Sequence, residues 1–322
     1  MTLPALWSPL RRIFVTLPVL WVVVSVVFLL IHLVPGDPIV QMLGEGATAA
    51  DISVLRHSYG LDAPLSQQYA HYWHGILRAD LGQSLRLHDS VTRLVAQRYP
   101  YTLALTLTLA ALLIGITAAV PAGVLSALHR SRWPDRTLGV VSLVGLSFPN
   151  FALGPLLILL FSIRLGWLPV SGAGTGGPGL QGVADFLLHL VLPALTLGLG
   201  LAAILTRMVR TAMLEELNQD YIRTARAKGL TESRVVYRHA LRNALIPVLT
   251  VIGLQFGSLL AGAIVTETIF SWPGIGRLTL SAISNRDYAL VQGCILTIGL
   301  TYVAVNLLTD IAYTIANPRI ST

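Results

Sequence analysis

The polar residues with the clearest functional pattern lie in segment 220–247, a basic stretch between two apolar blocks. Its only acids are Asp220 and Glu232. Such a segment can be a surface helix that rests on anionic lipid. Alternatively, it can be a docking helix that receives force from a separate soluble protein. Its cations are Arg223, Arg226, Lys228, Arg234, Arg238 and Arg242.

Other clusters are weaker candidates for ligand binding. His71 and His74 have the i, i+3 spacing of a metal pair, but no third ligand is nearby, which favours a solvated helix face. The glycine-rich run 172–177 lacks the Gly-Lys-Ser/Thr ending of a phosphate loop, and no strand precedes it. The sequence contains no Walker A loop and no His-Glu-x-x-His motif. We therefore expect no catalytic residue, no metal and no cofactor bound by this chain.

Several polar residues stand inside apolar segments, where polar groups are costly and by default indicate function. Pro149 interrupts one such segment and frees backbone carbonyls. It predicts either a packing kink or an irregularity that lines a pathway, and both interpretations remain open. The candidate pathway-lining residues are Ser147, Asn150, Gln255, Asn306 and Asp310.

The composition indicates an integral membrane protein. The 322 residues are 54% hydrophobic and only 11% charged, whereas soluble domains carry about 25% charged residues. The mean hydropathy is +0.70. The single cysteine, Cys294, excludes an internal disulfide. The net charge of +7 is better explained by basic loops on the cytoplasmic side than by nucleic-acid binding.

The apolar pattern predicts six membrane-spanning helices, and thus an all-α fold. A long polar segment, 35–98, follows the first span and contains two short predicted helices, 49–59 and 67–77. Segment 166–182, with its many glycines, is expected to be an outer loop. The predicted spans are 13–34, 101–128, 137–165, 187–208, 244–265 and 289–312.

The distribution of cations predicts the orientation in the membrane. Six spans place both termini on one side, and that side would carry 14 of the 22 cationic residues. Cations concentrate in short cytoplasmic loops. We therefore expect cytoplasmic termini, a cytoplasmic 220–247 segment and an external 35–98 segment. Arg11 and Arg12 precede the first apolar run, which no small-residue cleavage site follows, so we expect a retained helix.

Local patterns in segment 220–247 predict two short helices. Residues 221–228 are helical in pattern, Gly229 is suited to follow a helix end, and Thr231 is suited to cap the next helix. The spacing resembles the cytoplasmic coupling loop of type I ABC importer permeases. Their pattern is Glu-Ala-Ala, three residues, Gly, nine residues, Ile, one residue, Leu-Pro. Ala225, Gly229 and Leu241 match it; Arg223, Thr224, His239 and Arg242 depart from it.

The departures fit one branch of that family, the dipeptide/oligopeptide/nickel permeases. Thr-Ala-Arg-Ala-Lys-Gly at 224–229 and Arg-His-Ala-Leu-Arg-Asn-Ala-Leu-Ile-Pro at 238–247 are similar to that branch. Three further stretches agree and extend the resemblance over nearly the whole chain: 34–38, then 59–62 through 80–84, then 267–278. The first two of these belong to the subunit type with a long segment after the first span.

The resemblance implies a division of labour. The chain would pair with a second, homologous permease subunit, while two ATPase subunits would use ATP and Mg²⁺ and an external binding protein would deliver the solute. A coupling helix at about 218–228 would dock on one ATPase. The implied coupling residues are Tyr221, Thr224, Ala225, Arg226, Ala227, Lys228, Gly229, His239 and Leu241. Gate or structural roles are expected for Pro149, Glu267, Pro273, Gly274 and Gly276.

The expected organisation has three parts. Residues 1–94 form the first span and external segment, 95–316 a five-helix importer core with the coupling loop at 211–243, and 317–322 a cytoplasmic tail. The expected function is ATP-driven import of di- or oligopeptides across the bacterial inner membrane. Nickel, glutathione or another small solute is the alternative. A self-contained channel or secondary transporter is more remote, because no inverted repeat is evident.

Overall fold

The computed structural model describes residues 4–33, 37–43, 48–106, 110–177 and 179–316. These residues are mainly helical, as predicted, and the only β-pairing among them is one bridge between Gln83 and Ser90. The chain forms two compact units. The first comprises residues 102–272 with 1–10 and 305–322, and the second comprises 11–101 and 273–304. The predicted tail, 317–322, and the 34–36 part of the first family motif lie outside the described residues.

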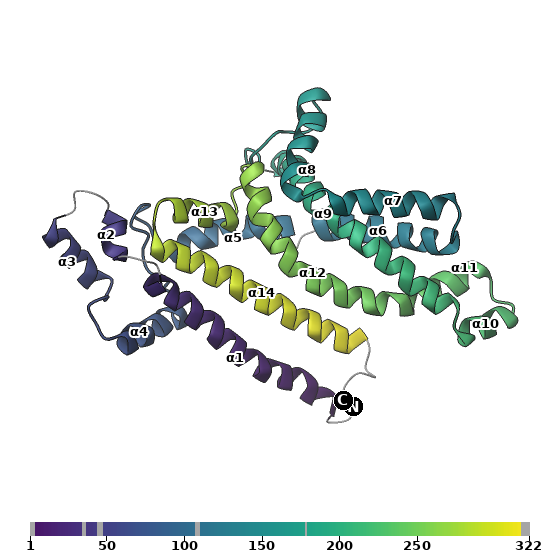
Figure 1. The fold of residues 1–322 in the computed structure, drawn as a ribbon, viewed down its shortest axis with the longest axis horizontal. Coiled ribbons are helices and arrows are strands. Elements are labelled where there is room, and N and C mark those ends of the chain that lie inside the picture. Colours follow the sequence, from purple (N-terminus) through teal and green to yellow (C-terminus); the bar gives the residue numbers. More distant parts are fainter. Residues whose placement is uncertain (1–3, 34–36, 44–47, 107–109, 178, 317–322) are drawn as a thin grey trace. The chain divides into compact units, whose positions relative to one another are not determined.

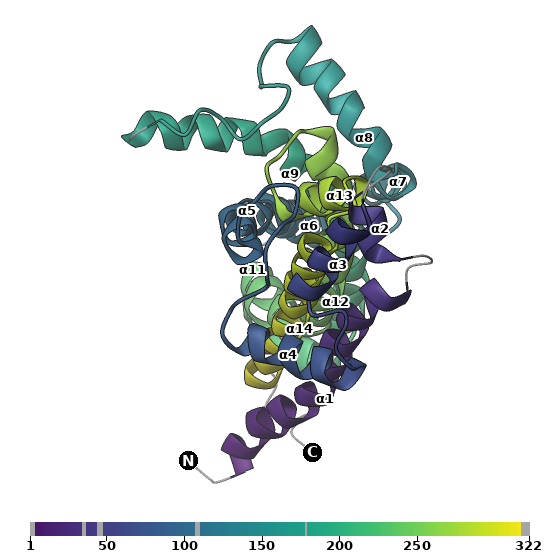
Figure 2. The same ribbon diagram turned by 90° about the vertical axis from the view of Figure 1, so that its left-hand side faces the viewer.

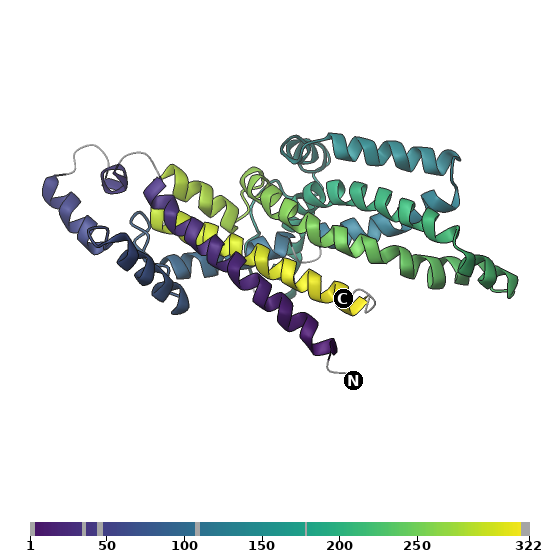
Figure 3. The same cartoon turned by 60° about the horizontal axis from the view of Figure 1, so that its bottom comes forward.

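The first unit is built around α9 (Gly179–Leu217). This helix packs most extensively on α6 (Ala110–Leu128), and also on α12 (Leu241–Ile269) and α7 (Trp133–Ser147) (Figure 3). A Cβ placed on Gly123 of α6 would lie 2.6 Å from the Cβ of Val209 on α9. Small residues of this kind allow membrane helices to approach closely.

Pro149 produces a sharp break, not a mild kink. It follows α7 and immediately precedes α8 (Asn150–Leu157), which continues into the π-helix η1 (Ile158–Arg164). The two halves are bent by 104°. Figure 1 and, from the side, Figure 2 show α8 leaving the direction of α7. The bend follows from proline chemistry, since Pro149 has no N–H to donate to Gly145 and the residue before a proline avoids the helical region.

By length and composition, three helical segments of the described chain could cross a membrane: Phe14–Leu33, Gly179–Leu217 and Tyr288–Ile311. The bent pair on either side of Pro149 would be a fourth. The predicted span 101–128 falls on two helices, α5 (Val91–Thr106) and α6, separated by residues 107–109, which lie outside the described part. The predicted span 244–265 lies inside α12. The 166–182 loop was predicted too long, because α9 begins at Gly179.

The second unit contains most of α1 (Pro4–Leu33), from Arg11 onward, and the first part of α14 (Tyr288–Ala316), up to Ala304. These two segments lie side by side. Val24 and Val27 pack against Leu296, and Gly299 lets Val23 approach. A second core joins Val91 of α5 to α13 (Ile275–Ser284) and to Cys294 of α14. The polar segment forms three short helices, of which the last two correspond to the predicted pair: α2 (Pro38–Leu43), α3 (Ala49–Ser58) and α4 (Leu65–Leu77).

Candidate functional site

The basic segment forms a short helix with a glycine-dependent end. Helix α10 spans Asp220–Ala227. Gly229 has φ +75°, and its N–H donates to the Arg226 carbonyl at 2.9 Å, while the Leu230 N–H reaches the Ala225 carbonyl at 3.4 Å. These two bonds form the helix-terminating Schellman motif, in which glycine is preferred because the left-handed conformation crowds a Cβ. The residue after the helix thus has the conformation that the sequence predicts.

Helix α10 has a buried face and an exposed face. Ile222 is 0% exposed and Ala225 is 8% exposed, and α10 contacts the π-helix η2 (Val235–Ala240), where Val235 and Val236 are also buried. Ala225 is therefore a packing residue, and only the outer face of α10 is accessible. The exposed α10 residues and their C-terminal neighbour are Asp220, Tyr221, Arg223, Thr224, Arg226, Ala227 and Lys228.

Two predicted coupling residues, Arg226 and Tyr221, make hydrogen bonds within the 211–243 loop. Arg226 donates to Glu232 at the start of α11 (Glu232–Arg234) through Nε at 3.1 Å and Nη2 at 2.6 Å. This pairing lowers the pKa of Glu232 below its usual value. Tyr221 donates to Glu216 and accepts from the Asn243 amide at 3.0 Å. Burial, followed by the Glu216 bond, raises the pKa of Tyr221 to about 12. Thr231 precedes α11 as predicted, but its side chain makes no capping bond.

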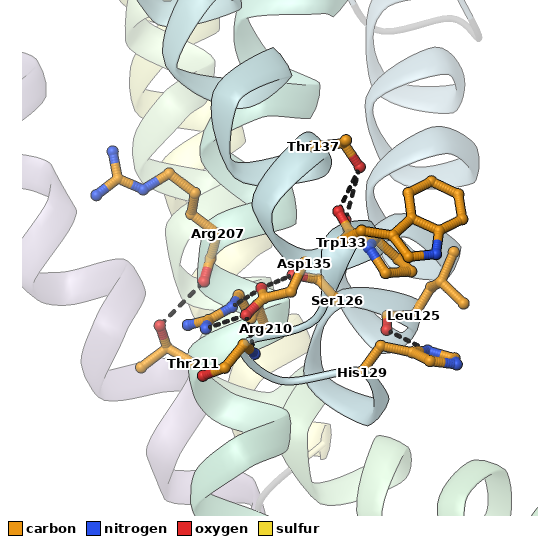
Figure 4. A network of polar contacts seen from close by, with 11 residues as sticks. Leu125, Ser126, His129, Trp133, Asp135, Thr137, Arg207, Arg210 and Thr211 are labelled. Carbon is orange, nitrogen blue, oxygen red and sulfur yellow. Dashed lines mark hydrogen bonds and ion pairs between the residues drawn. The ribbon is translucent and has the colours of Figure 1, made fainter.

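The helix that leads into α10 is held by a polar network (Figure 4). Arg210 of α9 binds Asp135 of α7 with two bonds, Nε to Oδ1 at 2.6 Å and Nη2 to Oδ2 at 2.9 Å. Asp135 also accepts from the Ser126 hydroxyl of α6 at 2.5 Å and from the Ser131 N–H at 2.8 Å. The bidentate pair joins α9 to α7, and the Ser126 bond adds α6. Because Asp135 is only 8% exposed, its carboxylate is little screened by water.

The Pro149 break opens a cavity of about 280 Å³ within the first unit. Asn150 and Gln255, both predicted to line a pathway, meet there with Pro149. Gly262 of α12 makes room for Asn150, since a Cβ on Gly262 would lie 3.0 Å from the amide nitrogen. The remaining lining residues are Gly145, Leu146, Phe148, Leu197, Gly200, Leu201, Ile204 and Leu259.

The other pathway candidates do not line this cavity. The Ser147 hydroxyl donates back to the Leu143 carbonyl of its own helix at 2.8 Å. Asn306 and Asp310 lie on α14, near the point where Thr309 packs against Gly253 of α12. A Cβ on Gly253 would lie 2.0 Å from the Thr309 methyl carbon, so this contact requires glycine.

The family stretch that starts at Glu267 lies partly in each unit. Glu267 is fully buried and accepts from the Thr102 hydroxyl at 2.6 Å. Its carbonyl accepts from the N–H of Trp272, which is itself buried, at 2.8 Å. Gly274 is the N-cap of α13 and Gly276 is buried in that helix. Pro273 is the first residue of segment 273–304 of the second unit. This geometry gives Glu267 a structural role in ordering the end of α12.

Comparison with known proteins identifies the family. Residues 119–322 match the family described as the binding-protein-dependent transport system inner membrane component, and residues 7–106 match the N-terminal region of such membrane components. The chain belongs to this family of ABC importer permeases. The permease is 44% identical over 311 residues, 97% of each chain, to the glutathione transport system permease protein GsiC of Pectobacterium atrosepticum. It is 42% identical over the same share to GsiC of Escherichia coli K12.

Solved structures support the same fold. The inward-facing MetNI methionine ABC transporter matches the permease with a TM-score of 0.56 at 20% identity, over 70% of this chain and 97% of that one. A second crystal form gives a TM-score of 0.54 at 18% identity over the same shares. At this identity the likeness concerns the fold alone. The permease therefore has the architecture of an importer membrane subunit.

Sequence patterns did not single out several residues that the structure places in close contacts. Asp135 is a lone acid among Arg130, Arg132 and Arg136, which is a usable signal for an ion pair. Arg210 entered only the count of cations. Gly253 and Gly262 carry no motif, and their role appears only when α12 is placed against Thr309 and Asn150.

Proposed function

We propose that this permease subunit carries glutathione or a similarly small peptide into the cell, driven by ATP hydrolysis on separate subunits. The observation that supports this most is the whole-length similarity to two glutathione permeases, at 44% and 42% identity. Glutathione is itself a tripeptide, so this proposal narrows the peptide function expected from the sequence motifs. Di- and oligopeptides and nickel are the alternatives within the same family.

In this proposal the permease works with four kinds of partner. A second permease subunit completes the pathway, two ATPase subunits bind ATP and Mg²⁺, an external binding protein delivers the solute, and lipid surrounds the spans. The outer face of α10 is the proposed ATPase contact, because it is exposed and basic while its inner face packs on η2. His239 in η2 and Leu241 at the start of α12 are half-buried in the second half of the loop.

The proposed topology has six spans, with both termini and α10 in the cytoplasm. The 1–94 region supplies the first span and external segment, 95–316 supplies the transport core with its coupling loop at 211–243, and 317–322 is the tail. The charge distribution supports this orientation, since cations gather in the loops assigned to the cytoplasm. A closing ATPase pair would then move α10 and, through it, bias two states of the pathway.

The test is uptake by the reconstituted complex. The permease, its partner permease, both ATPases and the binding protein are placed in vesicles, and entry of labelled glutathione, a dipeptide, a longer peptide and Ni²⁺ is measured. We expect ATP-dependent entry of glutathione, none with a hydrolysis-deficient ATPase and none without the binding protein. Entry through the permease without ATPase subunits would support a secondary transporter and overturn the proposal. Entry of Ni²⁺ alone would overturn the solute assignment.

A further inference from the structure

We propose that the cavity at the Pro149 break binds the ammonium group of the solute as it crosses the permease. This inference rests on the proposed transport of a peptide-like solute and adds the chemical feature that the permease itself recognises. Three observations carry it: the carbonyls released at the break, the two amide side chains, and the absence of charged residues from the cavity lining.

The break releases acceptors on the α7 side. The last bond across the end of α7 runs from the Phe148 N–H to the Val144 carbonyl at 3.2 Å. Pro149 offers no N–H to Gly145, and within the described chain no backbone N–H beyond α7 reaches the carbonyls of Gly145, Leu146 or Ser147. The carboxyl end of a helix carries a partial negative charge of about half an electron. Unpaired carbonyls there attract a cation or a strong hydrogen-bond donor.

The cavity lies where α7 ends and α8 begins. Gly145, Leu146 and Phe148 line it from the α7 side, and Pro149, the N-cap of α8, and Asn150, its first residue, line it from the other. The released carbonyls on the α7 side can only accept hydrogen bonds, which favours an ammonium group over a carboxylate.

Asn150 and Gln255 add side-chain acceptors to these carbonyls. Neither side chain is hydrogen-bonded to another group in the described residues, and both are partly buried. Each amide oxygen can accept from an ammonium group. None of the described residues that line the cavity is acidic or basic, so they present dipoles without a full charge. Sites of this kind hold a cation weakly enough to release it, which a transport pathway requires.

The size of the cavity limits what enters it. A volume of about 280 Å³ is below the range of about 300–1,000 Å³ typical of pockets that enclose drug-sized ligands. The cavity is therefore of a size for the amino-terminal part of a small peptide, and the rest of a longer peptide would extend beyond it. In glutathione that part is the γ-glutamyl residue, which carries the only ammonium group.

The experiment compares a solute with its N-acetylated form in the reconstituted complex. For each variant, the uptake rate of the free-amine solute is divided by that of its acetylated form, and this ratio is compared with the wild-type ratio. Because the binding protein is unchanged, a difference between the two ratios comes from the permease. We expect Asn150→Leu and Gln255→Leu each to reduce uptake of the free-amine solute by about 10-fold and to leave the acetylated solute within twofold. The matched control is Thr268→Val on α12, whose hydroxyl bonds only within its own helix.

A second variant needs no modified solute. Asn150→Asp keeps the shape and adds a negative charge, so uptake of the free-amine solute stays within twofold of wild type or rises. Thermal unfolding of each complex shows whether a variant merely fails to fold. The inference is wrong if both Leu variants slow uptake of the free and acetylated solutes equally. It is also wrong if the Leu variants discriminate against a solute with amidated carboxylates and not against the acetylated one. A loss of uptake in Asn150→Asp as large as that in Asn150→Leu would contradict it too. Absence of any ATP-dependent uptake in wild type would count against the proposed function instead.

Discussion

The two ends of α7 have opposite chemistry. Near the amino end, the carboxylate of Asp135 accepts four hydrogen bonds, from Arg210, Ser126 and Ser131. At the other end, Pro149 leaves carbonyls without backbone partners beside a cavity that contains two amides. A satisfied polar network fixes the geometry of its helices, whereas unpaired polar groups are available to a ligand. We infer that α7 is anchored at one end and open to solute at the other.

The anchored end also lies on the route to α10. Arg210 belongs to α9, which ends at Leu217, three residues before α10 begins. The 39 residues of α9 make a helix of about 58 Å, longer than the roughly 30 Å apolar core of a bilayer. A movement of α10 would therefore reach α6 and α7 through a long, firmly held helix. This comparison predicts large effects at the anchored end and smaller effects on folding at the open end.

Removal of Arg210 should have the largest effect on stability. Arg210→Ala leaves the Asp135 carboxylate buried without its cation, which we expect to destabilise the permease by about 3 kcal/mol. Thermal unfolding of the purified permease in detergent measures this change. Arg130→Ala is the matched control, since Arg130 is an exposed cation in the short link between α6 and α7. Equal unfolding temperatures for the Arg210→Ala and Arg130→Ala proteins would contradict the anchoring role.

Substitution of Gly229 should give an intermediate effect. Gly229→Ala places a Cβ in the left-handed conformation and should destabilise the end of α10 by about 1 kcal/mol. We expect fewer solute molecules carried per ATP hydrolysed, measured in the reconstituted complex. Gly229→Asn should retain more of the wild-type ratio, because asparagine tolerates this conformation better than alanine does. The conformational argument fails if the Ala and Asn variants behave alike.

At the open end, Pro149→Ala should change folding little and transport strongly. The new N–H can bond to a released carbonyl of α7, while the unfolded chain gains freedom, so the net stability change should be below about 1 kcal/mol. Uptake should fall because the cavity loses acceptors and the bend can straighten. If Pro149→Ala instead lost as much stability as Arg210→Ala and left uptake unchanged, the open end of α7 would have a structural role and no role in transport.

The smallest effect concerns the pH dependence of the α10 brace. The pKa of Glu232 is lowered in the folded protein, mainly by its hydrogen bonds from Arg226. The pair therefore stabilises the loop above the ordinary glutamate pKa of 4.5, which applies to the unfolded chain. This contribution is lost as the pH falls through the lower pKa of the folded state. Both side chains are largely exposed, so we expect at most about 0.5 kcal/mol. Glu232→Gln should remove this pH dependence in unfolding measurements between pH 6 and 3; an unchanged profile would contradict the assignment.

The comparison also explains what the sequence could predict. Local patterns were sufficient for α10, Gly229 and the short helices α3 and α4, because spacing, capping and turn preferences act over a few residues. The break at Pro149 was predicted, but its 104° bend was not, since the angle depends on packing of α8 against α9 and α12. The Asp135–Arg210 pair joins residues 75 positions apart, and single-sequence patterns do not report such contacts.

The central claim is that the outer face of α10 receives the ATPase, and site-directed cross-linking tests it most directly. Ala227→Cys is exposed on α10, whereas the native Cys294 is buried. In the complete complex, the Ala227→Cys permease should cross-link to an ATPase subunit that carries cysteines around its permease-docking groove. The cross-linking yield should change when ATP binds. Thr175→Cys, exposed in the predicted outer loop, should give no product. The account is contradicted if position 227 gives no ATPase product in any nucleotide state while the complex remains assembled and active.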